Sequence, residues 1–544
     1  MDSVEMVLGM LLAVIASGYL VRMLPFSLPL PLMQIALGAL IEGVFQHGVQ
    51  LQPDIFFLLF LPPLLFLDGW RIPKVGLFRD KAVILELALG LVLFTVLGAG
   101  FLIHWLIPGV PLAVAFALAA IVAPTDPVAF GAIAARVPVP PRLMHILEGE
   151  ALLNDATGLV CFRFAVAAAL TGQFSLANAS LTFLWVALAG IACGCGITLA
   201  VAAAQRVLSR RFGEELGSPI LINLLIPFGA YLAAEHLKAS GILAAVAAGI
   251  TMSYVELSGR ALATTRVRRA VVWDTVQFAL NGVMFVLLGE QLPDILRGAT
   301  RAGSNGAALD PWWLAGQALL ISLGLALLRF IWVWVSLQLT WFGRRRRGEL
   351  QIRQPLRLVL ATALGGVRGA ITLAGVLTLP LLLPNGAPFP ARDLAIFLAS
   401  AVIIVSLLLA SVVLPYVLPG LDVPGEEPDL AEEDMARAQA ANAAIAAVEQ
   451  TRHALCDNSI NADLHTNAAA HVISLYRHRI DGSAPGSGDA ARVQQADLAE
   501  RKLRLAALAA ERDAILALAR SGAIADHTGR KLLREIDLVE ARYR

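Results

Sequence analysis

Several carboxylates of this sequence fall inside apolar stretches that are long enough to cross a lipid bilayer. Asp126 lies in the run Ala-Pro-Thr-Asp-Pro at 123–127. A second run, Leu-Glu-Gly-Glu-Ala-Leu-Leu-Asn-Asp-Ala-Thr at 147–157, carries Glu150 and Asp155. A charged side chain is costly at that depth and marks an ion or proton pathway by default. The two runs therefore predict transport chemistry.

Asp126 is flanked by two prolines, which predicts that the helix carrying it is broken. Proline lacks an amide donor, so nearby backbone carbonyls are freed. Freed carbonyls, the Thr125 hydroxyl and the Asp126 carboxylate are hard oxygen ligands suited to Na⁺ or Li⁺. Broken helices hold small ions in this way in transporters. The alternative role for Asp126 is to cap a half-helix, and one side chain can do both.

The second run has the pattern of a helix on which Glu150 and Asn154 share one face. Asp155 points about 100° further round. An apolar helix with these three residues must turn them toward protein or water rather than lipid. The pattern favours a transport role for Asp155. A buried hydrogen-bonded cluster that holds helices together is the alternative, above all for Glu150.

A third polar cluster, Gly-Gly-Val-Arg-Gly-Ala-Ile-Thr at 365–372, interrupts another apolar span. Glycine pairs weaken a helix, and Arg368 near mid-membrane needs a partner. Glu150 is the predicted partner. The alternatives are that Arg368 neutralises Asp126 or lines the ion path.

Four other charged residues within the spans are not predicted to transport ions. Asp68 and Glu235 lie close to span ends, so a solvated or capping role is expected for each. The sequence assigns no role to Arg163 or Arg329.

The composition indicates a polytopic membrane protein with a C-terminal tail. Hydrophobic residues make up 58% of the 544 residues, charged residues 15%, and the mean hydropathy is +0.72. A soluble domain is about half apolar and a quarter charged. Residues 1–418 form the predicted transmembrane domain and 419–544 a helical tail, which begins with an acidic linker at 426–434. Thirteen spans of roughly membrane-crossing length are predicted, at 4–21, 27–45, 53–69, 82–106, 111–135, 144–171, 178–205, 219–236, 240–255, 271–291, 312–342, 358–383 and 393–417.

Basic residues in the loops orient the chain. Alternate loops carry twenty lysines and arginines on one side of the membrane and four on the other. The positive-inside rule places the richer side in the cytoplasm. With thirteen spans, the N-terminus is then expected outside and the tail in the cytoplasm.

The tail and the cysteines suggest few other partners. The tail is expected to pack on itself or on the tail of a second subunit, or to bind a regulator, and no nucleic-acid partner is expected. The four cysteines, three of them in apolar segments, give neither a disulfide framework nor a metal site.

Together these motifs resemble the monovalent cation:proton antiporters, specifically the bacterial type of their sodium/proton exchanger branch. The matching runs occur in the family's order over most of the predicted transmembrane domain, at 60–68, 125–129, 148–157, 278–289 and 365–373. The resemblance implies an all-α fold of about thirteen transmembrane helices with inverted repeats. It also implies a core domain in which the fifth and twelfth helices are unwound and cross, and a dimerisation domain that makes a homodimer.

The resemblance also implies roles for individual residues. Asp155 would be the main ligand of both cation and proton, with Asp126 and Thr125 contributing to the ion site. The supporting residues would be Asn154, Glu150 and Arg368, with Glu150 paired to Arg368. An Asn-Asp pair at 154–155 implies electroneutral one-for-one exchange. Where many relatives carry Ser after the second Glu of the motif, this chain has Ala151, so its ion site lacks one hydroxyl.

The expected function is therefore secondary antiport of Na⁺ or Li⁺ against H⁺ across a bacterial inner membrane, for pH and sodium homeostasis. No cofactor and no enzymatic activity are expected. K⁺/H⁺ exchange is the alternative. An ion channel would show a repeated carbonyl-filter motif. An intramembrane aspartyl hydrolase would need Asp126 and Asp155 to share a proton, which Asn154 and Arg368 fit less well.

Overall fold

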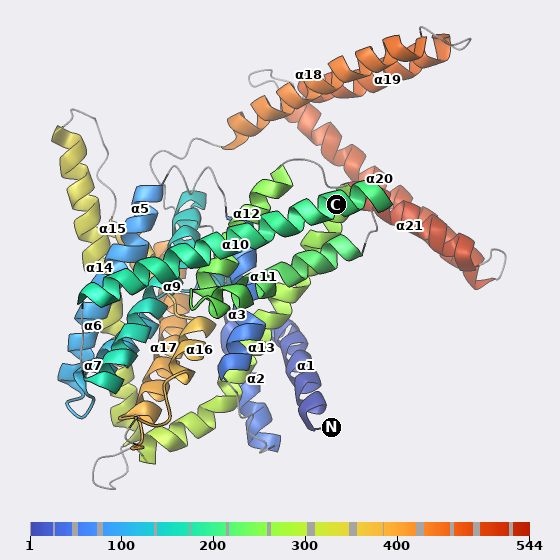
Figure 1. The fold of residues 1–544 in the computed structure, drawn as a ribbon. Helices are drawn as coiled ribbons and strands as arrows, with labels where there is room; N and C mark the ends of the chain where they lie inside the picture. The colour runs from blue at the N-terminus through green and yellow to red at the C-terminus, as the bar shows by residue number, and fades with distance from the viewer. Residues whose placement is uncertain are drawn as a thin grey trace. The chain divides into compact units, whose positions relative to one another are not determined.

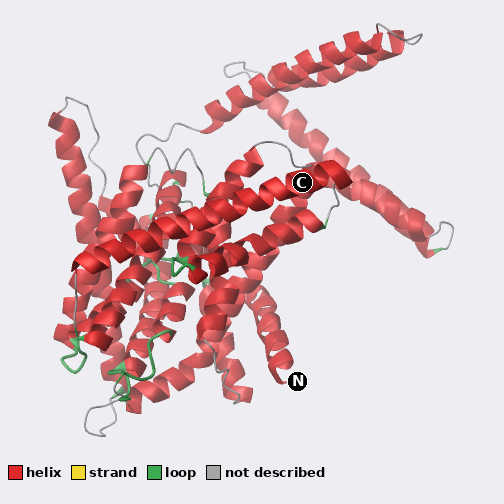
Figure 2. Cartoon of the chain, in the orientation of Figure 1, coloured by secondary structure: helices red, strands yellow, loops and turns green. Residues whose placement is uncertain are grey.

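The chain is almost entirely helical. The computed structural model describes residues 2–24, 28–45, 53–72, 80–134, 139–172, 176–213, 217–257, 263–301, 310–346, 356–384, 386–419, 429–456, 462–481, 490–521 and 526–543. Within these residues the elements are helices joined by loops, and the one β-bridge pairs Leu382 with Pro388 (Figure 2). The chain divides into two compact units, Met1–Pro424 and Gly425–Arg544. The predicted all-α class is confirmed.

The first unit has the helices of a multi-pass membrane protein. Among its described residues, eight helices are long and apolar enough to cross a membrane, and three more apolar helices are shorter. A bilayer demands this because it offers backbone groups no water, so each spanning segment must satisfy its own hydrogen bonds. Each of the thirteen predicted spans coincides with a described helix or with a pair of half-helices.

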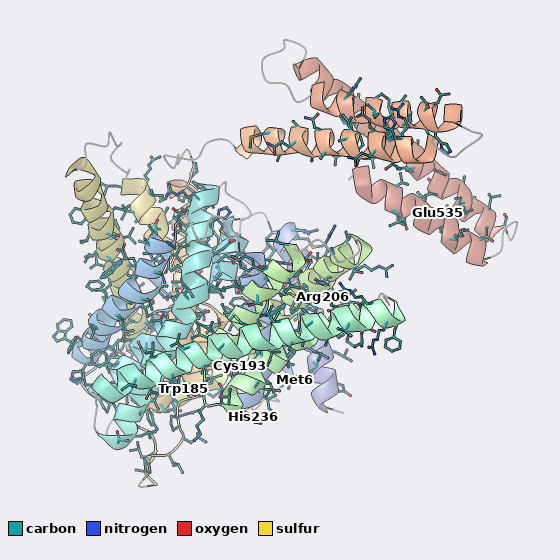
Figure 3. All side chains as sticks on the ribbon, turned by 45° about the horizontal axis from the view of Figure 1, so that its top comes forward. Met6, Trp185, Cys193, Arg206, His236 and Glu535 are labelled. Carbon is teal, nitrogen blue, oxygen red and sulfur yellow. The ribbon has the colours of Figure 1, made fainter. Side chains whose placement is uncertain are left out.

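One group of helices, here called the scaffold bundle, packs around α12 and α13. Helix α12 contacts α3, α10 and α11, and α13 contacts α1 and α2. The α2–α13 contact is very close, because a Cβ at Gly289 would collide with the backbone of Ile35. Figure 3 shows Trp185, Cys193 and Arg206 spread along the long helix α10. The helices of this bundle are α1 (Asp2–Met23), α2 (Leu30–Phe45), α3 (Pro53–Arg71), α10 (Leu176–Phe212), α11 (Ser218–His236), α12 (Gly241–Leu257) and α13 (Ala263–Arg301).

A second group, here called the core bundle, packs around α7, α9 and α17. Helix α7 contacts α6 and α9, and α14 joins α6 to α17. Its largest apolar cluster fills the space between α6, α7, α14 and α17, so these helices are held together as a body. Its helices are α5 (Lys81–Leu85), the π-helical η1 (Glu86–Leu91), α6 (Val92–Leu106), α7 (Leu112–Val122), α8 (Pro127–Ala134), α9 (Pro141–Thr171), α14 (Pro311–Arg346), α15 (Leu356–Leu364), α16 (Ala370–Leu377) and α17 (Arg392–Val417).

Two spans of the core bundle are broken, and the breaks meet. One span is interrupted between α7 and α8, where the Pro-Thr-Asp-Pro run lies, and the other between α15 and α16, at the glycine-rich run (Figure 1). The backbone N–H of Asp126 donates to the carbonyl of Val367 at 2.7 Å. This contact joins the two unwound segments, so the crossing predicted for the fifth and twelfth spans is present.

The second unit consists of two helical hairpins. Helix α18 (Asp429–Cys456) packs on α19 (Ala462–Asp481), and α20 (Ala490–Arg520) packs on α21 (Asp526–Tyr543). Arg512 ties the second hairpin together by ion pairs with Asp537, at 2.9 Å, and with Glu540.

Some residues used in the sequence predictions lie outside the described part of the chain. They are residues 426–428 of the acidic linker and, among the basic loop residues, Lys74, Arg79, Arg136, Arg260, Arg347 and Arg353.

Candidate functional site

Asp126 sits at the N-terminal end of the half-helix α8. The backbone N–H of Ala129 donates to its Oδ1 at 3.3 Å, which is a capping contact at a helix end that favours negative charge. The carboxylate lies against Gly369 of the other broken span, where any Cβ would overlap it. The capping role considered for Asp126 is therefore realised, and the crossing requires glycine at 369.

Arg368 occupies the opposite ends of the broken helices. Its side chain is 4% exposed. Nε donates to the carbonyl of Val122 at 2.9 Å, and the guanidinium also donates to the carbonyl of Gly366. These carbonyls belong to the C-terminal ends of α7 and α15, which favour positive charge. Arg368 thus neutralises backbone groups that the breaks set free.

The predicted ion pair between Glu150 and Arg368 is wrong, because Glu150 pairs with Arg329 of α14. Arg329 Nη2 lies 2.6 Å from Glu150 Oε2, and its Nη1 reaches Oε1, so the pair is bidentate. Arg329 Nε also donates to the carbonyl of Thr362 at 2.9 Å. Both side chains are almost fully buried. The physical reason is that Arg368 finds its acceptors in the freed carbonyls and needs no carboxylate.

Thr125 and Asn154 complete a buried network with Glu150. Asn154 Nδ2 donates to Thr125 Oγ1 at 3.0 Å and to Glu150 Oε1 at 3.4 Å. The hydroxyl of Thr125 donates to the same carboxylate oxygen at 3.5 Å. The structure therefore brings together the two residues whose spacing on one helix face was noted, and it links them to the broken span.

Asp155 differs from this network because its carboxylate has no partner in the described part of the chain. It is 6% exposed, and no described side chain or backbone group forms a hydrogen bond or ion pair with it. Most buried polar groups are hydrogen-bonded, so an exception calls for an explanation. Asp155 lines a cavity of about 530 Å³, here called the first cavity, together with Thr125, Asp126 and Ala151.

The first cavity carries further charged residues. Asp68 and Glu148 also line it, and the carboxylates of Asp68 and Asp126 are close enough to Asp155 to interact with it electrostatically. Arg71, on the same wall, is engaged by Asp274 and by Gln277 at 2.8 Å. A cavity in which several carboxylates face one unpartnered carboxylate attracts cations and protons.

Sequence reasoning missed Asp68 and Arg329. Asp68 was set aside because it follows the last turns of a predicted span, and it lies half-buried at the cavity wall. Its place within the matched run 60–68 was the available signal. Arg329 sits in the middle of a long apolar span, α14, and its depth there was the signal for a buried partner.

Comparison with known proteins finds a family that covers most of the first unit. Residues 9–419 match the family described as "Sodium/hydrogen exchanger, transmembrane". The chain is 42% identical over 540 residues to the Escherichia coli (strain K12) protein named "Uncharacterized Na(+)/H(+) exchanger YjcE", and the match covers 98% of both chains.

A second relative and a solved structure extend this comparison. The chain is 43% identical over 422 residues to the "Sodium, potassium, lithium and rubidium/H(+) antiporter" of Bacillus subtilis (strain 168), covering 76% of this chain and 61% of that protein. The structure of the sodium proton antiporter MjNhaP1 from Methanocaldococcus jannaschii at pH 8 superposes with a TM-score of 0.57. It shares 19% identity and covers 77% of this chain and 99% of that one. At that identity the likeness concerns the fold.

Proposed function

Because the chain belongs to the sodium/hydrogen exchanger family, a family of multi-pass cation/proton antiporters, we propose that it exchanges Na⁺ or Li⁺ for H⁺. The single observation that carries the proposal is Asp155, a buried carboxylate with no partner among the described residues, facing a cavity lined with other carboxylates. A group in this position is available to either ion.

The proposed mechanism is competition for one carboxylate. Asp155 carries a proton or a metal cation, but its negative charge compensates only one of them at a time. Asp126 and Thr125 line the same cavity and supply further oxygens for the cation. Glu150 stays ionised throughout because Arg329 holds both of its oxygens, so it keeps the site's framework charge constant.

Alternating exposure then follows from movement of one bundle against the other. Asp155, Asp126 and Thr125 all belong to the core bundle, whereas Asp68 and Arg71 belong to the scaffold bundle. The core bundle moves as a body in this proposal and carries the loaded site past the scaffold.

The proposed stoichiometry is one cation for one proton. Asn154 is a neutral amide and Glu150 is paired, so Asp155 is the carboxylate whose load changes. Exchange of one proton for one monovalent cation moves no net charge. A membrane potential should then neither drive nor slow the exchange.

K⁺ is the second candidate substrate. The Bacillus subtilis relative is named for potassium and rubidium as well as sodium and lithium. Ala151 contributes no hydroxyl to the cavity wall, so the ion must keep a water there, and a larger ion keeps its water at lower cost.

The test is dissipation of a pH gradient by the full-length protein in liposomes, with Na⁺, Li⁺ and K⁺ added in turn. We expect Na⁺ and Li⁺ to collapse the gradient and the D155N protein to be inert. If none of the three cations moves protons, the proposed function is wrong. Clamping the potential with K⁺ and valinomycin tests the stoichiometry, and a rate that scales with voltage would contradict one-for-one exchange.

The wider setting is proposed from the same family membership and the loop charges. The protein works in a bacterial inner membrane as a homodimer, with its N-terminus outside and its tail in the cytoplasm, and it needs no cofactor. The tail packs on itself or on a second tail, with binding of a regulator as the alternative.

A further inference from the structure

A second cavity lies along the same core helix as the first. It has a volume of about 610 Å³ and is lined by α9 of the core bundle and by α11 and α12 of the scaffold bundle. The first cavity touches α9 from Met144 to Asp155, and the second touches it from Leu159 to Leu170. The two cavities therefore occupy successive halves of the helix that carries Asp155.

Apolar side chains separate the second cavity from Asp155. Leu152 and Leu159 of α9 pack in one cluster with Ile242 and Val246 of α12 and with Ala374 of α16. Apolar packing excludes water and ions. In this conformation the second cavity is closed toward the candidate ion site.

An ion pair crosses between the two bundles at the wall of the second cavity. Arg163 Nη2 of α9 lies 3.6 Å from Glu235 Oε1 of α11, and both residues line the cavity. Their side chains are 53% and 37% exposed. Other ion pairs of the first unit, such as Arg329–Glu150 and Arg71–Asp274, stay inside one bundle.

This pair has a property that the surrounding apolar interface lacks. Apolar contacts are non-directional and are replaced by similar contacts when two surfaces slide. The attraction between two charges falls with their separation. A shift of α9 along α11 therefore breaks the pair while leaving the apolar interface largely compensated, so the pair favours one relative position of the bundles.

We propose that Arg163 and Glu235 form a latch that favours the conformation in which the first cavity is open and the second is shut off from Asp155. This proposal rests on the antiport function proposed above, and it adds that the latch must open in every transport cycle. Because both side chains are partly exposed, the bias is modest, about two- to fivefold in the ratio of the two conformations.

The direct test is a reversible bridge across the latch. In a background where Cys161, Cys193, Cys195 and Cys456 are replaced by serine, R163C and E235C are introduced together and joined with a bis-methanethiosulfonate reagent. We expect bridging to lower cation-driven proton movement in liposomes at least tenfold and reduction to restore it. Mass spectrometry of the bridged peptide measures the yield.

The control bridges D294C to R297C, an exposed ion pair within the single helix α13, and should leave exchange unchanged. The latch proposal fails if bridged R163C/E235C protein still exchanges at the unbridged rate, or if the reagent does not join these two cysteines. A loss of exchange already present in the unbridged, serine-substituted protein with every cation would instead contradict the proposed function.

A charge-reversal cycle measures the bias itself. V166C, in the same serine background, places a thiol on the wall of the second cavity, and its rate of labelling by a small charged reagent reports how often that cavity opens. R163E or E235R alone should raise the rate about two- to fivefold, and the R163E/E235R double variant should return it toward the starting value. Equal rates in all four proteins would overturn the proposal.

Discussion

Helix α9 carries two buried carboxylates little more than one turn apart, and they have opposite surroundings. Glu150 is 1% exposed and Asp155 is 6% exposed, so burial does not distinguish them. Glu150 is held by Arg329 through both oxygens and also accepts hydrogen bonds from Asn154 and Thr125. Asp155 has no such partner in the described residues and faces the first cavity.

The contrast shows that partners, rather than depth, separate a structural carboxylate from a transporting one. A buried charge with a bidentate counter-ion is locked, because removing either partner strands the other. A buried charge with no counter-ion must find one among the ions that reach it. The two residues can therefore be told apart by experiments on activity and on stability, which should respond in opposite ways.

The largest expected effect is that of D155N on activity. The substitution removes the charge that proton and cation both need, so exchange in liposomes should fall below detection. Because Asp155 makes no hydrogen bond to a described residue, the melting temperature and size-exclusion profile should stay close to those of the parent protein. Retained exchange, or a large loss of stability, would put Asp155 on the structural side of the comparison.

E150Q should show the reverse pattern. It leaves Arg329 buried without its counter-charge, and losing one partner of a buried pair costs about 3–5 kcal/mol of folding free energy. We expect a clearly lower melting temperature, and the double variant E150L/R329M should recover much of the loss because neither charge remains. An unchanged melting temperature for E150Q would refute the importance of the pair.

The sequence allowed the helices, the two breaks and the shared face of Glu150 and Asn154 to be predicted, because these depend on local rules. Apolar length sets the spans, Pro and Gly set the breaks, and a spacing of four residues sets the face. The partner of Glu150 could not be predicted in this way. Arg329 and Arg368 are equally buried and equally charged, and only the tertiary arrangement decides which one meets the carboxylate.

Arg368 shows why the wrong partner was chosen. A buried arginine was expected to need a carboxylate, but two broken helices bring their carbonyl ends together around it. Freed carbonyls are a consequence of the same breaks that were predicted from Pro and Gly. The inference missing from the sequence was that these carbonyls and the guanidinium satisfy each other.

A smaller effect is expected for D68N, which tests the outer carboxylates of the first cavity. Asp68 is half-buried and belongs to the scaffold bundle, so it attracts cations toward Asp155 without travelling with it. A partly exposed charge of this kind contributes up to about 1 kcal/mol. We expect the half-saturating Na⁺ concentration to rise up to about fivefold with little change in maximal rate. Complete loss of exchange would instead make Asp68 part of the transporting site.

The smallest expected effect is that of A151S, which adds one oxygen beside the unpartnered carboxylate. Ala151 is 2% exposed and lines the first cavity with Asp155 and Thr125. A serine hydroxyl there replaces a water that the cation would otherwise keep, and a neutral contact of this kind is worth about 0.5–1.5 kcal/mol. Small, hard ions such as Li⁺ and Na⁺ gain most from a fixed oxygen. Their half-saturating concentrations should fall roughly two- to threefold relative to that of K⁺. A151G, which alters the same position without adding an oxygen, is the matched control and should leave the cation order unchanged. If A151S and A151G behave alike in the liposome assay, the oxygen count at Ala151 does not set the preference, and selectivity must come from Asp126 and Thr125 instead.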